Sequence, residues 1–257
     1  MIDENKLRKI LEKARRETPS ITIDTLDDYD LGGVDCPICG NKGYIITRKD
    51  GINLTSRECK CMETRRSLRA IRRSGMADML DRYRLDNYQT PDEESKSVKQ
   101  SAIDFIGSPS GWFFICGRSG SGKTHICTAI CSEFIQKGIR TIYMLWRDEA
   151  TSLKSGITDR EWYRDRITKL KTVPVLYIDD FWKTDRRSGI DKVTGADVNL
   201  AFEILNARYN DTTLRTVISS ELTLDEIISI DEATGGRIYE RSRGFVKKAP
   251  QKNWRLT

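Results

Sequence analysis

The stretch from 117 to 124 reads Gly117-Arg118-Ser119-Gly120-Ser121-Gly122-Lys123-Thr124, which is a full match to the pattern G-x-x-x-x-G-K-[ST]. A short apolar run at 112–116 precedes it, and apolar residues at helical spacing follow it. Strand, glycine turn and helix in this order are the context in which the pattern forms a phosphate-binding loop. The glycines let backbone N–H groups converge on a phosphate chain, and the start of the helix adds favourable partial charge. The stretch therefore predicts a binding site for a nucleoside triphosphate.

The side chains of this loop have separate expected roles. Lys123 can reach the β- and γ-phosphates and act in catalysis, and the hydroxyl of Thr124 can ligate Mg²⁺. The other loop residues that we expect at the nucleotide are Gly117, Ser119, Gly120, Ser121, Gly122 and His125. The alternative interpretation is a flexible glycine loop ahead of a core helix.

Strand-like and helix-like segments alternate from residue 101 onward, which is typical of an open α/β sheet. The expected strands are Trp112–Cys116, Thr141–Leu145, Val173–Ile178 and Arg215–Ser219. The third strand runs into Asp179-Asp180, and an acidic residue at such a strand end, downstream of a phosphate loop, is the Walker B arrangement. We expect Asp179 to hold Mg²⁺ and Asp180 to orient or deprotonate the attacking water. The alternative for Asp180 is a solvated loop carboxylate.

Seven cysteines occur in the chain, and four of them form two close pairs near its start. They are Cys36 and Cys39 in CPICG, followed by Cys59 and Cys61 in CKC. Four soft ligands in two pairs suit tetrahedral Zn²⁺, and a closed shell of this kind is structural. Residues 43–52 between the pairs are expected to form a hairpin with an Asp-Gly turn, which would bring the pairs together. The alternative is a set of free thiols in a small core.

Charge and hydropathy narrow the class of protein. The 44 Lys and Arg residues exceed the 38 Asp and Glu residues by six, and basic residues gather in 57–84 and 237–257. Basic blocks suit a polyanionic partner, although a solvated surface is the commoner explanation. We see no apolar run of membrane-spanning length and no signal-peptide core, so we expect a cytoplasmic protein.

The chain is expected to divide into three parts. Residues 1–81 would form an N-terminal helical domain that binds zinc through its four cysteines, 82–100 a linker, and 101–257 the nucleotide-binding domain. The helix expected at 3–17 could pack on its own module or dock on a partner.

Several motifs occur together in a fixed order. They are CPICGNKGYI, the later CKC, GRSGSGKTH, YIDD, NARY at 206–209, VISSELTLDEI and GGRIYERS. Together they resemble the DnaC/DnaI-type replicative helicase loaders of the AAA+ superfamily, particularly their phage and Gram-positive forms. The resemblance runs from about 36 to 243, and its specificity lies in the ordered set and in the upstream cysteine module, because many superfamilies share the phosphate loop.

The resemblance implies an α/β fold: an AAA+ P-loop ATPase with a parallel sheet flanked by helices, plus a small zinc-binding domain. It also implies that Arg237 is an arginine finger for a neighbouring subunit's γ-phosphate, with Arg241 as its helper, and that Ser220 is the sensor. Relatives usually place Asn after the sensor, whereas Glu221 stands here and cannot donate a hydrogen bond. A finger supplied in trans makes ATP hydrolysis to ADP depend on assembly and slow without it.

The resemblance further implies three partners: a replicative hexameric DNA helicase at the N-terminal domain, single-stranded DNA at the ATPase domain, and further copies of the chain. Two groups of residues mix cations with aromatic rings, which suits backbone neutralisation and base stacking. They are Lys154, Arg160, Trp162 and Arg164, and then Phe181, Trp182, Lys183, Arg186 and Arg187. Any one of these residues is more often explained by surface or core packing.

The leading hypothesis is an ATP-dependent loader that places a replicative helicase on single-stranded DNA. The first alternative is an IstB-like transposition-helper ATPase, which normally lacks the cysteine module. The second is an ATP-gated DNA-binding adaptor with negligible hydrolysis.

Overall fold

The computed structural model describes residues 36–49, 53–62, 65, 76–183, 192–254 and 256. Several features of the sequence lie outside these residues: the expected helix at 3–17, the acidic stretch at 24–35, Arg186 and Arg187. No helix in the described part of the chain has the length and apolar character that a membrane crossing needs.

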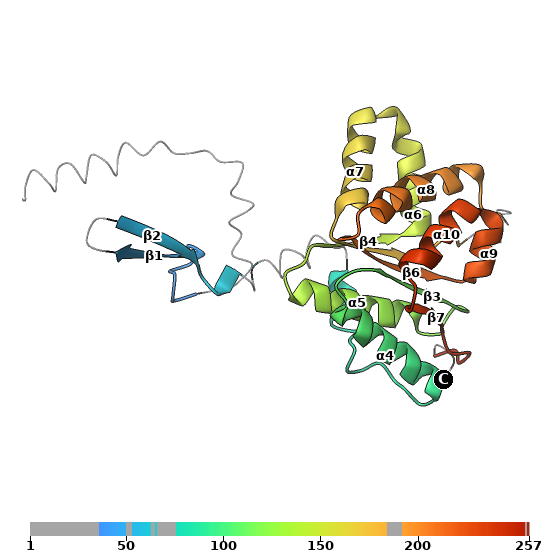
Figure 1. The fold of residues 1–257 in the computed structure, drawn as a ribbon, viewed down its shortest axis with the longest axis horizontal. Coiled ribbons are helices and arrows are strands. Elements are labelled where there is room, and N and C mark those ends of the chain that lie inside the picture. Colours follow the sequence, from blue (N-terminus) through green and yellow to red (C-terminus); the bar gives the residue numbers. More distant parts are fainter. Residues whose placement is uncertain are drawn as a thin grey trace, which may run out of the picture.

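A five-stranded sheet forms the centre of the ATPase part (Figure 1), with strand order β4-β5-β6-β3-β7. The strands are β3 (Trp112–Cys116), β4 (Thr141–Leu145), β5 (Val175–Asp179), β6 (Arg215–Ser220) and β7 (Val246–Lys248). Every pairing is parallel. The carboxyl ends of β3 and β5 therefore open on the same edge of the sheet, where open α/β folds bind ligands.

Helices cover both faces of the sheet (Figure 1), so the open α/β prediction is confirmed. On one side lie α3 (Ala77–Leu80), α4 (Glu93–Gly107) and α5 (Lys123–Gln136). On the other lie α6 (Trp146–Ser155), the 3₁₀ turn η2 (Gly156–Thr158), α7 (Arg160–Thr172), α8 (Gly195–Asn210), α9 (Leu224–Ile230) and α10 (Glu232–Arg241). Because both faces are covered, β3 and β5 are buried along their whole length, which explains why these strands read as continuous apolar runs.

The predicted linker at 82–100 is instead part of the ATPase body. Helix α4 begins at Glu93, after a capping box in which Asp92 accepts from the backbone of Ser95, so the boundary at 101 falls inside a helix. Met76 and Tyr88 pack in the same core as β3 and α5. The linker prediction is wrong because Pro91 and the polar residues around it mark a helix start rather than a flexible joint.

The cysteine-bearing segment forms a two-stranded antiparallel hairpin, as expected. Strand β1 (Tyr44–Lys49) pairs with β2 (Asn53–Glu58), in a register that places Tyr44 opposite Glu58. The expected Asp-Gly turn lies at 50–51, outside the described residues. This pairing brings the two ends of the hairpin, and with them the two cysteine pairs, to the same place.

Candidate functional site

The phosphate loop connects β3 to α5, and its backbone has the shape that the glycine pattern predicts. Gly120 and Gly122 have φ values of 80° and 89°, in the left-handed region that glycine adopts most readily. Gly122 is also the N-cap of α5, and its carbonyl accepts from the backbone of Ile126. A Cβ at Gly120 would overlap the side chain of Asn253, so this position is also restricted by packing.

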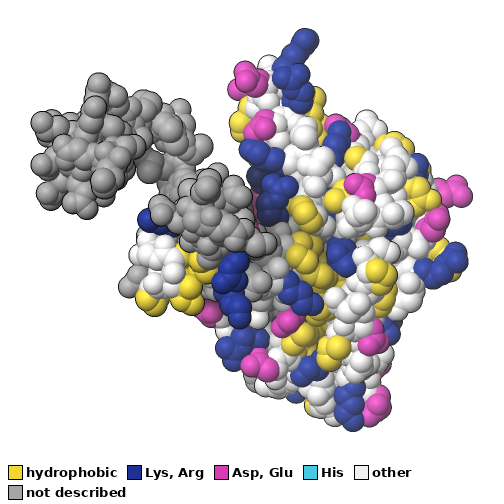
Figure 2. Space-filling model, turned by 60° about the vertical axis from the view of Figure 1, so that its left-hand side comes forward, with side chains coloured by type: hydrophobic (Ala, Val, Ile, Leu, Met, Phe, Trp, Pro, Cys, Tyr) yellow, Lys and Arg dark blue, Asp and Glu magenta, His cyan; other side chains and the backbone are white. Residues whose placement is uncertain are grey.

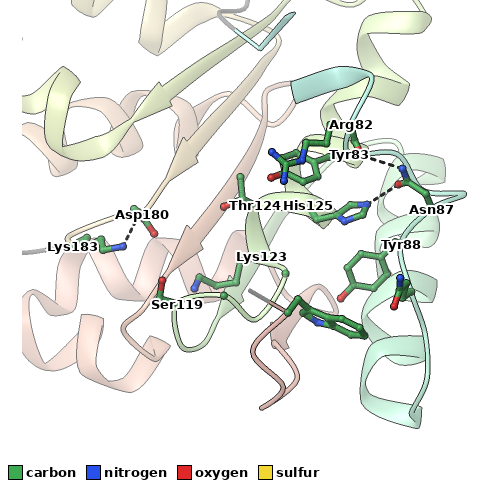
Figure 3. A pocket seen from close by; sticks show the side chains of 14 residues that line it. Arg82, Tyr83, Asn87, Tyr88, Ser119, Lys123, Thr124, His125, Asp180 and Lys183 are labelled. Atoms are coloured by element: carbon green, nitrogen blue, oxygen red, sulfur yellow. Dashed lines mark hydrogen bonds and ion pairs between the residues drawn. The ribbon is translucent and has the colours of Figure 1, made fainter. Parts of the chain in front are cut away.

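Lys123 points back into its own loop (Figure 3). Its ammonium donates to the backbone oxygens of Gly117, at 2.7 Å, and Arg118, at 2.9 Å. Burial lowers the pKa of Lys123, while the carboxylates of Asp180 and Glu221 act in the opposite direction. The ammonium is therefore a largely desolvated cation beside several acidic groups, and it is placed to interact strongly with a phosphate.

Asp179 closes β5 directly beside the start of α5. Its Oδ2 lies 3.5 Å from the Thr124 hydroxyl and 3.3 Å from the Tyr143 hydroxyl, and its other oxygen accepts from Ser219. A threonine hydroxyl and a carboxylate oxygen, both hard ligands, thus meet at one point. This donor set fits Mg²⁺, which binds through one or two protein oxygens together with phosphate oxygens and waters.

Asp180, the second acidic residue, lines the cavity beside the loop. Its backbone has a φ of 51°, which is uncommon for a residue other than glycine and is found disproportionately at functional sites. Its carboxylate pairs with Lys183 at 2.9 Å, and Lys183 also lies 3.0 Å from Glu221. Burial disfavours the charged ammonium of Lys183, but its hydrogen bonds to Asp180 and Glu221 have the larger effect and raise the pKa of Lys183.

The cavity over the loop has a volume of about 330 Å³. Ser119, Gly120, Gly122, Lys123, Thr124, His125, Asp180 and Lys183 form one side of it, and Arg82, Tyr83, Asn87, Tyr88, Gln89 and Trp254 form the other. Figure 3 shows this division, with Asp180 and Lys183 across the cavity from the aromatic residues. The polar side suits phosphates and the aromatic side suits a planar base.

His125 holds the aromatic side to the loop. Its Nε2 lies 3.0 Å from the carbonyl oxygen of Arg84 and 2.9 Å from Oδ1 of Asn87, and its ring packs against Tyr83 and Tyr88. Burial lowers the pKa of His125, so the imidazole is neutral at pH 7. The prediction placed His125 at the nucleotide, and the structure places it in the cavity wall.

Two segments of this wall were missed by the sequence interpretation. Residues 82–89 were predicted to be part of a linker. The two tyrosines in this segment, Tyr83 and Tyr88, are a signal that could have suggested an aromatic platform. The C-terminal segment comes back across the loop: Ala249 donates its N–H to the Cys116 carbonyl, and Trp254 donates to the Gly120 carbonyl. Nothing in the local pattern of 249–254 indicates this return.

The sensor prediction on Ser220 is not supported by its geometry. Ser220 is fully buried, donates its hydroxyl to the carbonyl of Phe181 and accepts from the N–H of Leu222. The preceding residue, Ser219, donates to Asp179 and accepts from the backbone of Asp180. Successive side chains of a strand point to opposite faces of the sheet. Ser219 therefore faces Asp179, and its neighbour Ser220, the predicted sensor, points to the other face.

Arg237 and Arg241 both lie on α10, outside the cavity of their own chain. Arg237 donates to Asn206 and to the Ala233 carbonyl, and its guanidinium lies over Phe202 and Tyr209. Arg241 donates to the Thr212 carbonyl. A role for either arginine at a nucleotide therefore requires the cavity of a neighbouring chain, and it stays a prediction.

Two of the residues predicted to stack on DNA bases are in the core. Phe181 and Trp182 are 0% and 2% exposed and stack on each other with ring centroids 4.7 Å apart. Trp146 closes on Phe181 edge-on. The prediction that these rings bind DNA is wrong, because the turn after β5 places both of them in the hydrophobic core.

The predicted DNA-binding lysines are engaged in ion pairs. Lys154 pairs with Asp197 at 2.7 Å, and Lys183 pairs with Asp180 and Glu221. Trp162 is 39% exposed, but it lines a surface hollow with three carboxylates, and an acidic hollow does not favour a polyanion. The acidic residues are Asp159, Glu161 and Asp165, and Arg164 is the basic residue beside them. A DNA-binding role for Lys154, Arg160, Trp162, Lys183 and Arg164 stays a prediction.

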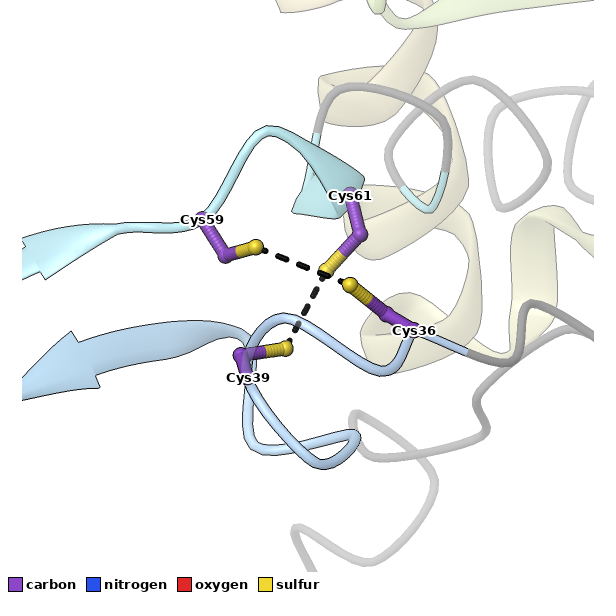
Figure 4. Close-up of side chains that lie close together, drawn as sticks. All are labelled: Cys36, Cys39, Cys59 and Cys61. Carbon is purple, nitrogen blue, oxygen red and sulfur yellow. Dashed lines mark hydrogen bonds between the residues drawn. The ribbon is translucent and has the colours of Figure 1, made fainter.

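The four N-terminal cysteines converge on one point (Figure 4), with all four sulfur atoms within 4.8 Å of one another. The Sγ atoms of Cys36 and Cys59 are 3.7 Å apart, and those of Cys39 and Cys61 are 3.6 Å apart. Tetrahedral thiolates bound at about 2.3 Å from Zn²⁺ are separated by about 3.8 Å, so the donor set fits this ion. The backbone N–H of Gly43 donates to the Cys39 sulfur, which adds the support that metal ligands receive.

Known proteins are similar in sequence to this chain over most of its length. The chain is 31% identical to the uncharacterized protein YqaM of Bacillus subtilis over 202 residues, which is 74% of this chain and 62% of YqaM. It is 26% identical to the phage-like element PBSX protein XkdC of the same organism, covering 93% of this chain and 91% of XkdC.

The third relative is the replicative helicase loader DnaC of Escherichia coli, 24% identical over 57% of this chain and 66% of DnaC. A crystal structure of the DnaC helicase loader shares the fold, with a TM-score of 0.57 at 20% identity, over 66% of this chain and 98% of that one. The family model for IstB-like ATP binding proteins matches residues 49–233. The phosphate loop, the two aspartates and most of the parallel sheet fall inside this match, so the chain belongs to the IstB/DnaC family of AAA+ ATP-binding proteins.

Proposed function

We propose that this protein hydrolyses ATP and uses the ATP-bound state to deliver a replicative helicase onto single-stranded DNA. The observation that carries the proposal is the cavity in which Lys123, Thr124 and Asp180 face an aromatic wall, next to Asp179. A cation for phosphates, two hard ligands and a second carboxylate are the set that phosphoryl transfer to water requires.

Four residues, Lys123, Thr124, Asp179 and Asp180, have roles in this mechanism. Lys123 exchanges its loop carbonyls for β- and γ-phosphate oxygens, and the loop N–H groups bind the same phosphate chain. Thr124 and Asp179 would hold Mg²⁺, which would supply positive charge to the phosphates. Asp180 accepts a hydrogen bond from the attacking water and orients it toward the γ-phosphate.

The aromatic wall is proposed to bind the base. Trp254 is placed against the loop by its bond to Gly120, and Tyr88, which is 5% exposed, lines the same wall. We expect Trp254→Ala to weaken ADP binding about fivefold or more, because stacking on one aromatic ring contributes about 1–3 kcal/mol. Trp254→Phe should keep most of the affinity.

Isothermal titration with ADP and Mg²⁺ measures this effect. Tyr239→Ala, which changes an exposed aromatic residue on α10, is the matched control and should bind as the wild type does. Unchanged ADP affinity in folded Trp254→Ala would show that the base lies elsewhere.

The helicase-loading part of the proposal rests on the relatives and on the cysteine module. DnaC of Escherichia coli is a replicative helicase loader, and the hairpin with its four cysteines is a compact module separate in sequence from the ATPase core. Figure 2 shows Lys and Arg side chains recurring from the top to the bottom of one face, with Asp and Glu side chains scattered among them. The basic side chains of this face are the groups that we expect to contact the phosphate backbone of single-stranded DNA.

Cys39→Ser tests the docking role of the module. Loss of one of four ligands is expected to lower bound zinc from about one equivalent to nearly none and to abolish capture of purified replicative helicase, while ATP affinity stays within about twofold. Metal analysis and a pull-down with and without ATP measure both effects. Lys60→Ala changes an exposed residue between two ligands and is the control. A zinc-free, folded variant that captures helicase normally would refute this role.

A second candidate is an IstB-like transposition helper, which the family match favours as directly. Both functions use the same ATP site, so ATP binding does not separate them. Helicase capture does, because a transposition helper would bind a transposase instead. The ATP-gated adaptor with negligible hydrolysis is separated by turnover: a rate unaffected by Asp180→Asn would favour it.

A further inference from the structure

The turn that follows β5 carries a lysine back toward the phosphate loop. The N–H of Lys183 donates to the carbonyl of Asp180 at 3.0 Å, and Trp182 between them has a φ of 56°. The N–H of Phe181 donates to the Ser219 carbonyl at 2.8 Å, which ties the turn to β6. The two buried, stacked rings anchor it from below. Lys183 is therefore presented from a rigid turn rather than from a flexible loop.

The ammonium of Lys183 lies between two carboxylates, and one of these, that of Asp180, lines the cavity together with Lys183 (Figure 3). The ammonium is 2.9 Å from Asp180 and 3.0 Å from Glu221, and the Lys183 side chain is 37% exposed. Asp179, Asp180, Glu221 and Lys183 all act electrostatically on Lys123, so the five groups form one charged cluster. The cluster holds three acids and two lysines.

Glu221 explains why a second lysine is needed. It follows β6, next to the Walker aspartates, and its carboxylate can only accept hydrogen bonds. A carboxylate at this point repels a terminal phosphate unless a cation stands between them. Lys183 is that cation, and its ammonium has three N–H donors, of which two suffice for the carboxylates.

We propose that Lys183 is a second phosphate-binding cation that contacts the terminal phosphate of a bound nucleoside triphosphate, and that Glu221 is its positioning residue. This inference rests on the proposed ATP site and adds to it the group that distinguishes ATP from ADP. Lys123 lies within the loop, where it serves both nucleotides. Lys183 approaches from the turn after β5, beside Asp180, and there it would meet the third phosphate of a triphosphate.

The contact also affects Asp180. In the structure the Asp180 carboxylate is paired with Lys183, and a paired carboxylate is a weaker acceptor for water. A triphosphate that draws the ammonium toward itself would release Asp180 at the moment when the attacking water needs it. ADP, which lacks the terminal phosphate, leaves the pair in place.

The test compares affinities for ADP and for a non-hydrolysable ATP analogue, each with Mg²⁺, by isothermal titration. Lys183→Met is expected to weaken analogue binding about tenfold or more and ADP binding less than about threefold, because a charge-assisted hydrogen bond is lost only with the triphosphate. Lys183→Arg should retain most of the preference. Glu221→Gln should weaken analogue binding by a smaller factor, since it frees the ammonium without removing it.

Two further variants separate contact from charge neutralisation. Lys169→Met removes a lysine that pairs with Asp165 on the surface of α7, and it should bind both ligands as the wild type does. Asp180→Asn/Lys183→Met/Glu221→Gln removes the repulsion that an unpaired Asp180 and an unpaired Glu221 would cause. If Lys183 contacts the phosphate, the triple variant stays defective for the analogue.

Restored preference in the triple variant would show that Lys183 only neutralises Asp180 and Glu221 and would overturn the inference. Equal losses for both ligands in Lys183→Met would overturn it as well. A wild-type protein that bound neither nucleotide would instead refute the proposed ATP site itself, and this outcome is recognised before any variant is made.

Discussion

Lys123→Ala is expected to weaken ATP binding at least about a hundredfold and to abolish measurable hydrolysis. Lys123 is 5% exposed, and its ammonium already donates to oxygen acceptors at 2.7 and 2.9 Å, so its exchange onto phosphate oxygens requires little reorganisation. Hydrogen bonds between charged groups contribute about 1.5–3 kcal/mol each, and Lys123 can make two of them to the triphosphate. A hundredfold loss corresponds to about 2.7 kcal/mol.

Titration of the variant with ATP and Mg²⁺ measures the loss, with thermal unfolding as the test of folding. Lys137→Ala is the matched control, because Lys137 is an exposed lysine at the other end of the same helix, α5. If folded Lys123→Ala bound and responded to ATP as the wild type does, the phosphate loop would have no role in nucleotide binding, and the proposed function would fail with it.

Arg208→Met is expected to lower the free energy of unfolding by about 3–5 kcal/mol, because it removes buried hydrogen bonds. Arg208 is fully buried on α8, and its guanidinium donates to four backbone carbonyls, those of Leu170, Lys171, Val173 and Arg215, and to the hydroxyl of Thr216. Burial lowers its pKa to about 9, so it remains charged at pH 7. Methionine fills the volume but leaves buried carbonyls without donors, each at a cost of about 1–3 kcal/mol.

Chemical denaturation of wild type and variant gives the difference directly. Arg243→Met, at an exposed position just after α10, should change the unfolding free energy by less than about 0.5 kcal/mol. A change below about 1 kcal/mol for Arg208→Met would show that water replaces the guanidinium and that this arginine does not fasten α7 and β6 to α8.

Much of the ATPase fold follows from local sequence. The strands Trp112–Cys116 and Thr141–Leu145 have the bounds that their apolar runs predict. Strand β3 is buried along its whole length, and a strand covered on both faces needs continuous apolar residues. A capping box of Thr223 and Glu226 begins α9, and it is a local feature because both partners lie within one helical turn. The pairs of cysteines meet because a hairpin joins them.

The sequence by itself determined the four strands β3, β4, β5 and β6, the phosphate loop with Lys123, and the two aspartates at the end of β5, because each depends on residues that are neighbours along the chain. Only the tertiary structure decided that Phe181 and Trp182 are core anchors, that Ser219 rather than Ser220 faces Asp179, and that residues 82–89 and Trp254 complete the cavity. These outcomes depend on which face of a strand is turned inward and on which distant segments pack together. Burial and packing are properties of the assembled core, and no local pattern contains them.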